Sequence, residues 1–247
     1  MPTFFVATDS VVPPTVRITG PLLHHLRQSL RVQPGEPLTV TDDSGRRYRT
    51  EVGEITARHL TARILETTTA PPKTSPSIVL AQALLKGEKM DWIIQKATEL
   101  GVDRIAPVVT SHGVVKPRAE RLEHQRARWQ RIALEAAQQC ERWSVPTIDE
   151  PATVSQLMTA YDTAGAIKLF LAERSSGASL ADIAAGLGAE QTVLLVVGPE
   201  GGWDKEELRL AQERGCQAIT MGKNILRAET AALAAISVLQ ARFGELG

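Results

Sequence analysis

The chain has 247 residues, 43% of them hydrophobic, so it can bury a sizeable core and is not a disordered protein. Its 28 lysines and arginines balance 28 acids, which argues against a protein that coats nucleic acid through bulk charge but allows a local basic face. Two cysteines without paired spacing give no disulfide framework or zinc knuckle. The first residues lack the pattern of a signal peptide, and no apolar run approaches ~18 residues. We therefore expect a cytoplasmic protein with no membrane partner.

Short strand-like runs dominate the beginning of the chain and predict a small β-barrel over residues 1–70. These runs occupy residues 3–7, 15–18, 37–41, 47–55 and 59–65. One amphipathic helix over residues 20–31 interrupts them, and its spacing places Leu22, Leu23, Leu26 and Leu30 on one face. Small barrels often bind RNA, but the fold alone does not establish that function.

A proline-rich stretch without apolar periodicity follows at residues 67–77 and predicts a linker, which we place at residues 71–77. The second domain then covers residues 78–247. Its strand-like runs lie at residues 78–85, 104–109, 167–171, 193–197 and 218–221. Its helical stretches lie at residues 91–100, 117–141, 154–161, 180–185, 205–214 and 228–243. Strands that alternate with helices indicate an α/β domain with a mostly parallel sheet.

A glycine-bearing loop follows the most apolar of these runs. Residues 193–197 are all aliphatic, as expected for a strand buried on both faces, and Gly198-Pro199-Glu200-Gly201-Gly202 comes directly after them. Ligands of parallel sheets bind outside the carboxyl ends of the strands, and glycines leave the backbone open to a ligand. A tight connection between strand and helix is the alternative explanation of the loop.

A second loop of the same kind spans residues 222–227, again between a strand-like run and a helix. Neither loop matches the dinucleotide fingerprint or the phosphate-binding loop of nucleotide-binding proteins. No cradle for a pyrophosphate is visible in either. The two loops therefore predict one shared site for a small ligand with an apolar adenine and few phosphate groups.

The two loops together resemble the SPOUT class of methyltransferases, and other segments narrow the resemblance to the RsmE family. Residues 86–102, KGEKMDWIIQKATELGV, are similar to the family's K-G-x-x-M-x-x-x-x-Q-K-x-x-E-L-G-V segment. Gln139-Cys140-Glu141-Arg142, with Pro146 after it, is similar to its E-Q-[SC]-x-R-x-x-x-P segment, except that Gln138 stands where the family has an acid. The resemblance covers most of residues 78–243, whereas residues 1–70 fit the family's PUA-like barrel in length and pattern only.

The resemblance implies a fold, a cofactor and a reaction. The fold is a SPOUT-type α/β domain with a C-terminal trefoil knot, preceded by a PUA-like β-barrel, in a homodimer with its active site near the subunit interface. The reaction is S-adenosylmethionine-dependent methylation of N3 of a uridine in 16S ribosomal RNA, at the decoding site of the small ribosomal subunit. The implied cofactor-binding residues follow three strands: Leu171, Ala172, Glu173, Gly198, Pro199, Glu200, Gly201, Gly202, Met221, Gly222, Ile225 and Leu226.

Three charged residues are our candidates for the chemistry, which needs no metal because the methyl group leaves a sulfonium. Arg227 would stabilise the uridine anion or an adjacent phosphate, unless it simply pairs with Glu200 or Glu229. Glu200 would accept or orient the departing proton, unless it caps the next helix. Arg142 would reach the site or the RNA backbone.

The remaining candidates concern RNA contacts and a cysteine. Exposed cations that would contact phosphates are Arg27, Arg31, Lys86, Lys116 and Arg118. We interpret Cys140 as a packing or substrate-contacting residue, because methylation at N3 requires no thiol; a thiolate that attacks C6 of the base, as in methylation at C5, is the alternative. Two other functions stay open at this point, namely a SPOUT enzyme that modifies another RNA and a non-catalytic RNA-binding factor of ribosome assembly.

Overall fold

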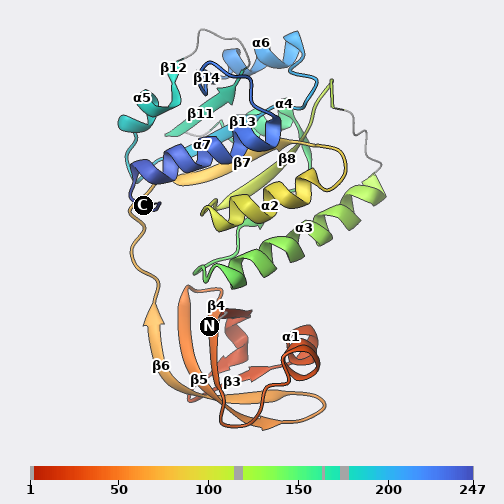
Figure 1. The fold of residues 1–247 in the computed structure, drawn as a ribbon, viewed down its shortest axis with the longest axis vertical. Helices are drawn as coiled ribbons and strands as arrows, with labels where there is room; N and C mark the ends of the chain where they lie inside the picture. The colour runs from red at the N-terminus through yellow and green to blue at the C-terminus, as the bar shows by residue number, and fades with distance from the viewer. Residues whose placement is uncertain (1–2, 114–118, 163–164, 173–177, 247) are drawn as a thin grey trace. The chain divides into compact units, whose positions relative to one another are not determined.

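The computed structural model describes residues 3–113, 119–162, 165–172 and 178–246, and they form two compact units (Figure 1). The first unit combines residues 1–72 with residues 137–144, and the second combines residues 73–136 with residues 145–247. The last turn of one long helix, α3 (Ala119–Gln139), is thereby grouped with the first unit although the helix begins in the second.

The first unit is built on one curled sheet of six strands in the order β1-β4-β5-β6-β3-β2. The strands are β1 (Thr3–Val6), β2 (Val11–Val12), β3 (Thr15–Ile18), β4 (Pro37–Asp42), β5 (Arg46–Ile55) and β6 (Leu60–Thr69). The helical segments are η1 (Thr8–Ser10), α1 (Gly20–His24) and η2 (His25–Ser29). All neighbouring strands are antiparallel except β1 and β4, and two register shifts between β5 and β6 increase the local bend of the sheet.

The helical segment of the first unit packs on the sheet through fewer leucines than its spacing predicts. Leu23 and Leu26 are buried, but Leu30 is 47% exposed, so the prediction of one face with four leucines is wrong. The reason is a change of helical pitch: the α-helix ends at His24 and continues as a π-helix over His25–Ser29. Arg31 then adopts a left-handed conformation with a φ of 54°, which ends the helix.

Asp42, at the end of β4, is a buried carboxylate with four hydrogen bonds. Its Oδ1 accepts from the backbone N of Ser44 at 2.9 Å, from Oγ of Ser44 at 2.7 Å and from the backbone N of Arg46 at 3.0 Å. Its Oδ2 accepts from the hydroxyl of Tyr48 at 2.8 Å. Burial by itself would raise the pKa of Asp42, but these hydrogen bonds outweigh it and hold the pKa below its usual value.

The second unit contains a parallel sheet with the order β10-β8-β7-β13-β11-β14-β12, and β9 pairs with β8. The strands are β7 (Ser77–Ala83), β8 (Arg104–Val109), β9 (Thr147–Ile148), β10 (Ala152–Thr153), β11 (Ala166–Leu171), β12 (Ala178–Ser179), β13 (Thr192–Val197) and β14 (Gln217–Thr220). Besides α3, the helices are α2 (Lys89–Glu99), α4 (Val154–Ala160), α5 (Leu180–Ala185), α6 (Lys205–Glu213) and α7 (Ala228–Arg242).

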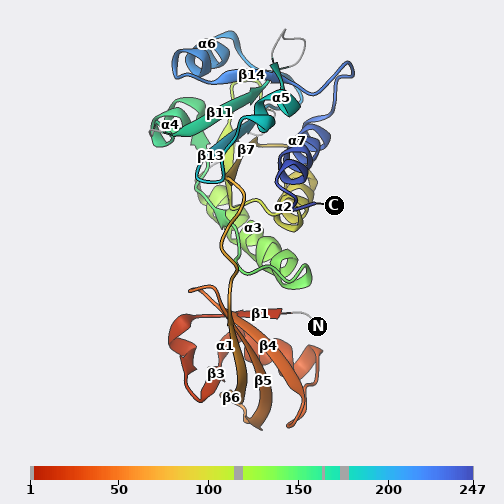
Figure 2. The ribbon, with the colours of Figure 1, turned by 90° about the vertical axis from the view of Figure 1, so that its left-hand side faces the viewer.

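Helices cover both faces of this sheet, so its central strands are apolar on both sides (Figure 2). On β13, Val193, Leu195 and Val197 pack in one core with residues of α2, α5 and α7. Leu194 and Val196 point to the opposite face and pack in a second core with residues of α4 and α6. The aliphatic run at residues 193–197 therefore reflects a strand in the middle layer of a three-layer domain.

The predicted α/β fold with a mostly parallel sheet is confirmed, and every predicted run of three or more residues contains the expected type of element. The two-residue strands β2, β9, β10 and β12 were not predicted, because two residues carry no periodicity. Within the described part of the chain, no helix has the length and apolar character needed to cross a membrane.

Asp42→Asn removes the buried charge while nearly keeping the shape of the side chain. We expect the variant to lose about 1–3 kcal/mol of unfolding free energy near neutral pH. Since the folded-state pKa lies below the unfolded-state value, the wild-type advantage is present above about pH 4 and is lost as the pH falls through the folded pKa. Urea unfolding of both proteins at a series of pH values measures this difference in unfolding free energy. A difference that stays constant down to about pH 3 would contradict the stabilising role of the hydrogen bonds to the Asp42 carboxylate.

Candidate functional site

A cavity of about 460 Å³ lies at the carboxyl ends of three neighbouring strands, β11, β13 and β14. Its volume falls within the ~300–1,000 Å³ typical of small-molecule sites. The wall consists of strand ends, the loops that follow them and the start of α7: Leu171, Ala172, Val197, Gly198, Pro199, Glu200, Gly202, Trp203, Ile219, Thr220, Met221, Gly222, Lys223, Asn224, Ile225, Leu226, Arg227, Ala228 and Ala231.

The register of the sheet brings the three strand ends to one level. β11 lies between β13 and β14, and its last residue, Leu171, is the register partner of both Val197 and Ile219. All three strands are parallel, so their following loops leave from the same edge of the sheet. The two glycine loops, distant in sequence, consequently border one cavity, as the sequence predicts.

Trp203, which directly follows the first glycine loop, forms part of the wall. Its Nε1 donates to the backbone oxygen of Leu171 at 3.1 Å, and its ring packs on that of Phe170 with centroids 4.3 Å apart. A Cβ at position 198 would lie 2.6 Å from Nε1 and 2.8 Å from Cε2 of this indole. Position 198 therefore requires glycine because the indole occupies the space of a side chain.

Two other glycines of the loops are required for their backbone conformation. Gly202 has a φ of 73° and Gly222 a φ of 105°, both in the region that side chains disfavour, although a Cβ at either position would meet no atom within 4 Å. Gly222 lies two residues after the end of β14, and Gly202 lies five residues after the end of β13, at the far end of its loop. The backbone groups beside the cavity are thereby left without side-chain cover.

Lys89, the first residue of α2, connects two acids near the cavity. Its Nζ contacts the carboxylate of Glu200 and lies 3.5 Å from Oε1 of Glu229. The hydrogen bond with Glu200 raises the pKa of Lys89, which keeps this ammonium charged. Oε2 of Glu229 is buried and has no hydrogen-bond partner among the described residues. Glu200 thus lines the cavity as one half of an ion pair.

The capping alternative for Glu200 is wrong, because other residues cap the helix that follows. Asp204 accepts a hydrogen bond from the backbone N of Glu206 at 2.9 Å, and the side chain of Glu207 accepts one from the backbone N of Asp204 at 3.2 Å. These two acids complete a capping box at the start of α6.

Arg227 precedes α7 and extends an exposed side chain that lines the cavity. Both acids that the sequence offers as partners, Glu200 and Glu229, contact Lys89 instead, so the pairing alternative for Arg227 is wrong. In the described part of the chain, the Arg227 guanidinium has no ion-pair partner. Its charge is thus free to meet a ligand at the cavity.

Most residues of the predicted cofactor set line the cavity, with two exceptions. Gly201 does not line it; a Cβ at this glycine would lie 3.2 Å from the backbone oxygen of His112. Glu173 lies outside the described residues. The residues of the set that do line the cavity are Leu171, Ala172, Gly198, Pro199, Glu200, Gly202, Met221, Gly222, Ile225 and Leu226.

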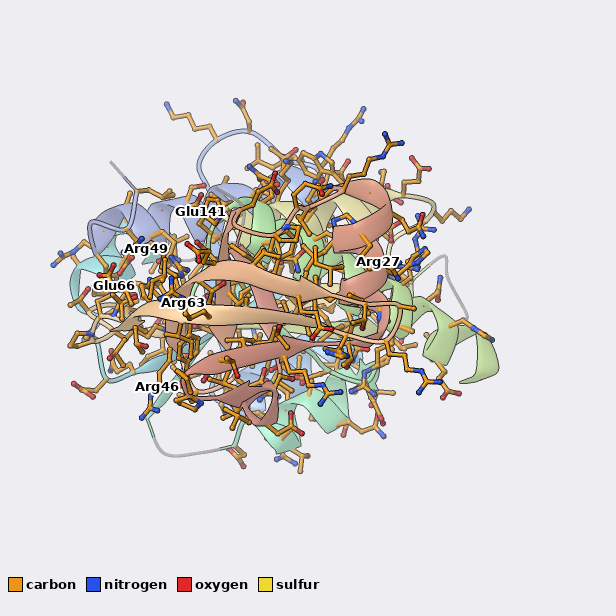
Figure 3. The ribbon with its side chains drawn as sticks, turned by 90° about the horizontal axis from the view of Figure 1, so that it is seen from below. Arg27, Arg46, Arg49, Arg63, Glu66 and Glu141 are labelled. Atoms are coloured by element: carbon orange, nitrogen blue, oxygen red, sulfur yellow. The ribbon has the colours of Figure 1, made fainter. Side chains whose placement is uncertain are left out.

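Arg142 is not among the residues that line the cavity, and it belongs to the first unit. It follows the end of α3, where its Nε donates to the backbone oxygen of Ser144 at 3.1 Å. Arg27 and Arg31 of the same unit are exposed, and Figure 3 shows Arg27 on the helical segment, away from Arg46 and Arg49.

The other predicted RNA contacts belong to the second unit. Lys86 is exposed just before α2, whereas Lys116 and Arg118 lie outside the described residues.

Cys140 is half-buried, belongs to the first unit and does not line the cavity; its Sγ lies 3.9 Å from the backbone oxygen of Ala137. The other cysteine, Cys216, is buried in the second unit, and burial raises the pKa of its thiol to about 11. A thiol with that pKa is almost wholly protonated near neutral pH and is a poor nucleophile.

The sequence does not predict several residues of the wall, among them Val197, Trp203 and Ile219. Trp203 carries one usable signal, since an aromatic residue directly after a glycine loop has a bare backbone to pack on. The contact of Lys89 with Glu200 and Glu229 joins three separate motifs, and no spacing rule connects them.

Comparison with known families matches residues 72–240 to an RNA methyltransferase domain and residues 18–65 to an RNA methyltransferase PUA domain. The α/β fold, the cavity at its strand ends and the preceding curled sheet thus define an RNA methyltransferase with a PUA domain.

Individual relatives show to which family of RNA methyltransferases the chain belongs. Ribosomal RNA small subunit methyltransferase E of Synechocystis is 34% identical over 96% of this chain and 76% of its own length. The protein of the same name from Bacillus subtilis is 30% identical over 92% of this chain and 90% of its own length. The Neisseria gonorrhoeae protein of that name, whose crystal structure was solved with bound S-adenosyl methionine, is 33% identical in sequence. Its structure matches this one with a TM-score of 0.86 and covers 98% of this chain and 97% of that chain. The chain belongs to the ribosomal RNA small subunit methyltransferase E family, which confirms the resemblance to the RsmE family.

Gly198→Ala tests the close packing of Trp203 on the first glycine loop. We expect the added methyl group to lower the unfolding free energy by about 1–3 kcal/mol, because the indole must move and loses its hydrogen bond to Leu171. Gly188→Ala is the matched control, since its Cβ would meet nothing within 4 Å. Denaturant unfolding measures both variants. The loss of unfolding free energy caused by Gly198→Ala should be smaller when Trp203 is also replaced by Phe. An equal loss in that background would show that the added methyl group does not collide with the indole.

Proposed function

We propose that the protein methylates N3 of one uridine in 16S ribosomal RNA, at the decoding site of the small ribosomal subunit, and that it works in the cytoplasm with S-adenosylmethionine as methyl donor. The observation that carries this proposal is the cavity at the ends of β11, β13 and β14. Family membership supports it, since the relatives are named ribosomal RNA small subunit methyltransferase E and one of them was solved with S-adenosyl methionine.

The cavity suits S-adenosylmethionine in both size and chemistry. Leu171, Val197 and Ile219 provide an apolar wall for an adenine ring. Bare backbone beside Gly198 and Gly222 offers N–H and C=O groups to the polar edge of the adenine and to the methionine moiety. The loops provide no pyrophosphate cradle, which agrees with a cofactor that has no phosphate group.

S-adenosylmethionine supplies an electrophilic methyl group on a positively charged sulfur. Uridine N3 is a weak acid, so it must lose a proton before it becomes a nucleophile. Arg227 would stabilise the resulting anion or a neighbouring phosphate, because its charge has no ion-pair partner among the described residues. Glu200, the one carboxylate among the described lining residues, would accept or orient the proton, and Lys89 would hold Glu200 in place. Positioning of the two reactants supplies the rest, worth up to ~7–11 kcal/mol in favourable cases.

Exposed cations would hold the RNA around this site. We assign phosphate contacts to Arg27, Arg31 and Lys86, and also to Lys116 and Arg118, which lie outside the described residues. RNA binding should then weaken steeply with salt, because each neutralised phosphate releases counterions.

We further propose that the segment around the cavity forms a trefoil knot and that the enzyme is a homodimer with its active sites near the subunit interface. In such a dimer, Arg142 would reach the RNA bound at the site. Light scattering at working concentrations tests the dimer, and a monomer there would refute it.

Loss of the protein from cells should remove one 3-methyluridine from 16S ribosomal RNA. Mass-spectrometric mapping of that RNA, with and without the protein, measures the effect. Purified protein and S-adenosylmethionine should restore the modification on RNA or small subunits from the deficient cells. If no methyluridine disappears, the assigned substrate is wrong. Calorimetric titration with S-adenosylmethionine adds a separate test, since a protein that fails to bind it would be a non-catalytic factor.

Arg227→Ala should lower kcat about 10²–10³-fold, because the anion that forms on the base loses its countercharge. Lys223→Ala is the matched control, since Lys223 is an exposed cation in the same loop and also lines the cavity. Single-turnover methylation gives the rates, and calorimetry should show unchanged cofactor affinity in both variants. An Arg227→Ala enzyme with a normal rate would rule out the catalytic role.

A further inference from the structure

The turn that ends α3 carries the family segment Gln139-Cys140-Glu141-Arg142, and its backbone is strained. Glu141 adopts a left-handed conformation with a φ of 56°. The N–H of Arg142 donates to the oxygen of Ala137 at 3.0 Å, and the N–H of Glu141 approaches the oxygen of Gln138 at 3.4 Å. This is the Schellman pattern, in which glycine usually occupies the left-handed position. A glutamate there needs other contacts that keep the turn closed.

Arg47 of β5 supplies such contacts through its whole guanidinium. Its Nη2 donates to the backbone oxygens of Glu141 at 2.8 Å and of Arg142 at 2.9 Å. Its Nε donates to Oγ1 of Thr41 at 3.1 Å, and its Cζ lies 4.0 Å from the centroid of the Trp143 ring. One side chain therefore ties two consecutive carbonyls of the turn and the following tryptophan to the sheet.

Arg47 differs in these contacts from Arg49 and Arg63 of the same sheet. Arg49 pairs with Glu66 at 3.1 Å (Figure 3), and Arg63 pairs with Glu51 at 3.1 Å; both pairs are exposed. Exposed pairs of this kind contribute little to stability. Arg47 is half-buried, is directed at backbone oxygens and rests on Thr41, which is itself buried. The planar guanidinium can satisfy all these partners at once, whereas a lysine ammonium cannot stack and donate in the same geometry.

We propose that Arg47 is a positioning residue for methylation, which holds the strained turn at the end of α3 so that Arg142 is presented to the RNA. The inference rests on the proposed function of Arg142 as an RNA contact. It assigns to Arg47 no contact with the RNA itself. The distinction matters because Arg47 lies in the basic segment Arg46-Arg47-Tyr48-Arg49, where an arginine is readily mistaken for a direct phosphate contact.

The test combines one substitution that weakens the contacts of Arg47 with a second substitution, at Glu141, that makes those contacts unnecessary. Arg47→Lys keeps the charge but loses the planar fork, and it should raise KM for the RNA about tenfold with little change in kcat. Glu141→Gly places glycine at the left-handed position, so the turn closes without help. The double variant Arg47→Lys with Glu141→Gly should recover most of the lost affinity. If Arg47 bound RNA directly, Glu141→Gly would not restore it, and the proposal would be overturned.

A second measurement is independent of catalysis. Hydrogen exchange of the Arg142 amide reports closure of the turn, because that N–H donates to Ala137. Exchange should accelerate in Arg47→Lys, return towards the wild-type rate in the double variant and stay unchanged in the control Arg49→Lys. Unchanged exchange in Arg47→Lys would refute the claim that Arg47 keeps the turn closed. If the double variant regains the wild-type exchange rate but not the RNA affinity, Arg47 does not position Arg142 for RNA binding. If the wild-type protein does not methylate the RNA at all, the proposed function is contradicted instead.

Discussion

The parallel pairing of β11 with both β13 and β14 is the constraint on which the candidate site depends. Because Leu171 is in register with Val197 and Ile219, three strands end at one level and their loops converge. The glycines, the packing of Trp203 and the placement of Arg227 all follow from this convergence, since a shift of one strand would move its loop away from the other two. The helices on both faces hold the register through two apolar cores rather than through the site itself.

Much of this arrangement could be predicted, because it depends on patterns within short stretches of the sequence. The five aliphatic residues 193–197 indicate a strand covered on both faces, and the glycines after it indicate open backbone at a strand end. The apolar spacing of residues 91–100 predicts α2 to within two residues at its start. Family motifs then supplied what periodicity cannot, namely the class of enzyme to which the two loops belong.

The parts that sequence could not provide depend on contacts between distant residues. Nothing local in Lys89, Glu200 and Glu229 predicts that one ammonium meets both acids, and this contact removed the pairing alternative for Arg227. The exposure of Leu30 follows from a π-helical turn, which an apolar period of 3.6 residues does not distinguish from a continuing α-helix. The motif suggests that Arg142 reaches the site or the RNA, but Arg142 does not line the cavity, and its N–H closes the end of α3 among residues grouped with the first unit.

The composition of the first unit from residues 1–72 and residues 137–144 has a consequence for how the protein is made. When the ribosome has synthesised the last strand of the curled sheet, the chain does not yet contain the turn that Arg47 binds. Some seventy further residues, including all of α2 and α3, must emerge before Arg47 finds its carbonyl partners. The unit that begins synthesis first is thus completed only after residues 73–136 of the second unit have been made, so an N-terminal fragment cut at the linker lacks one of its own parts.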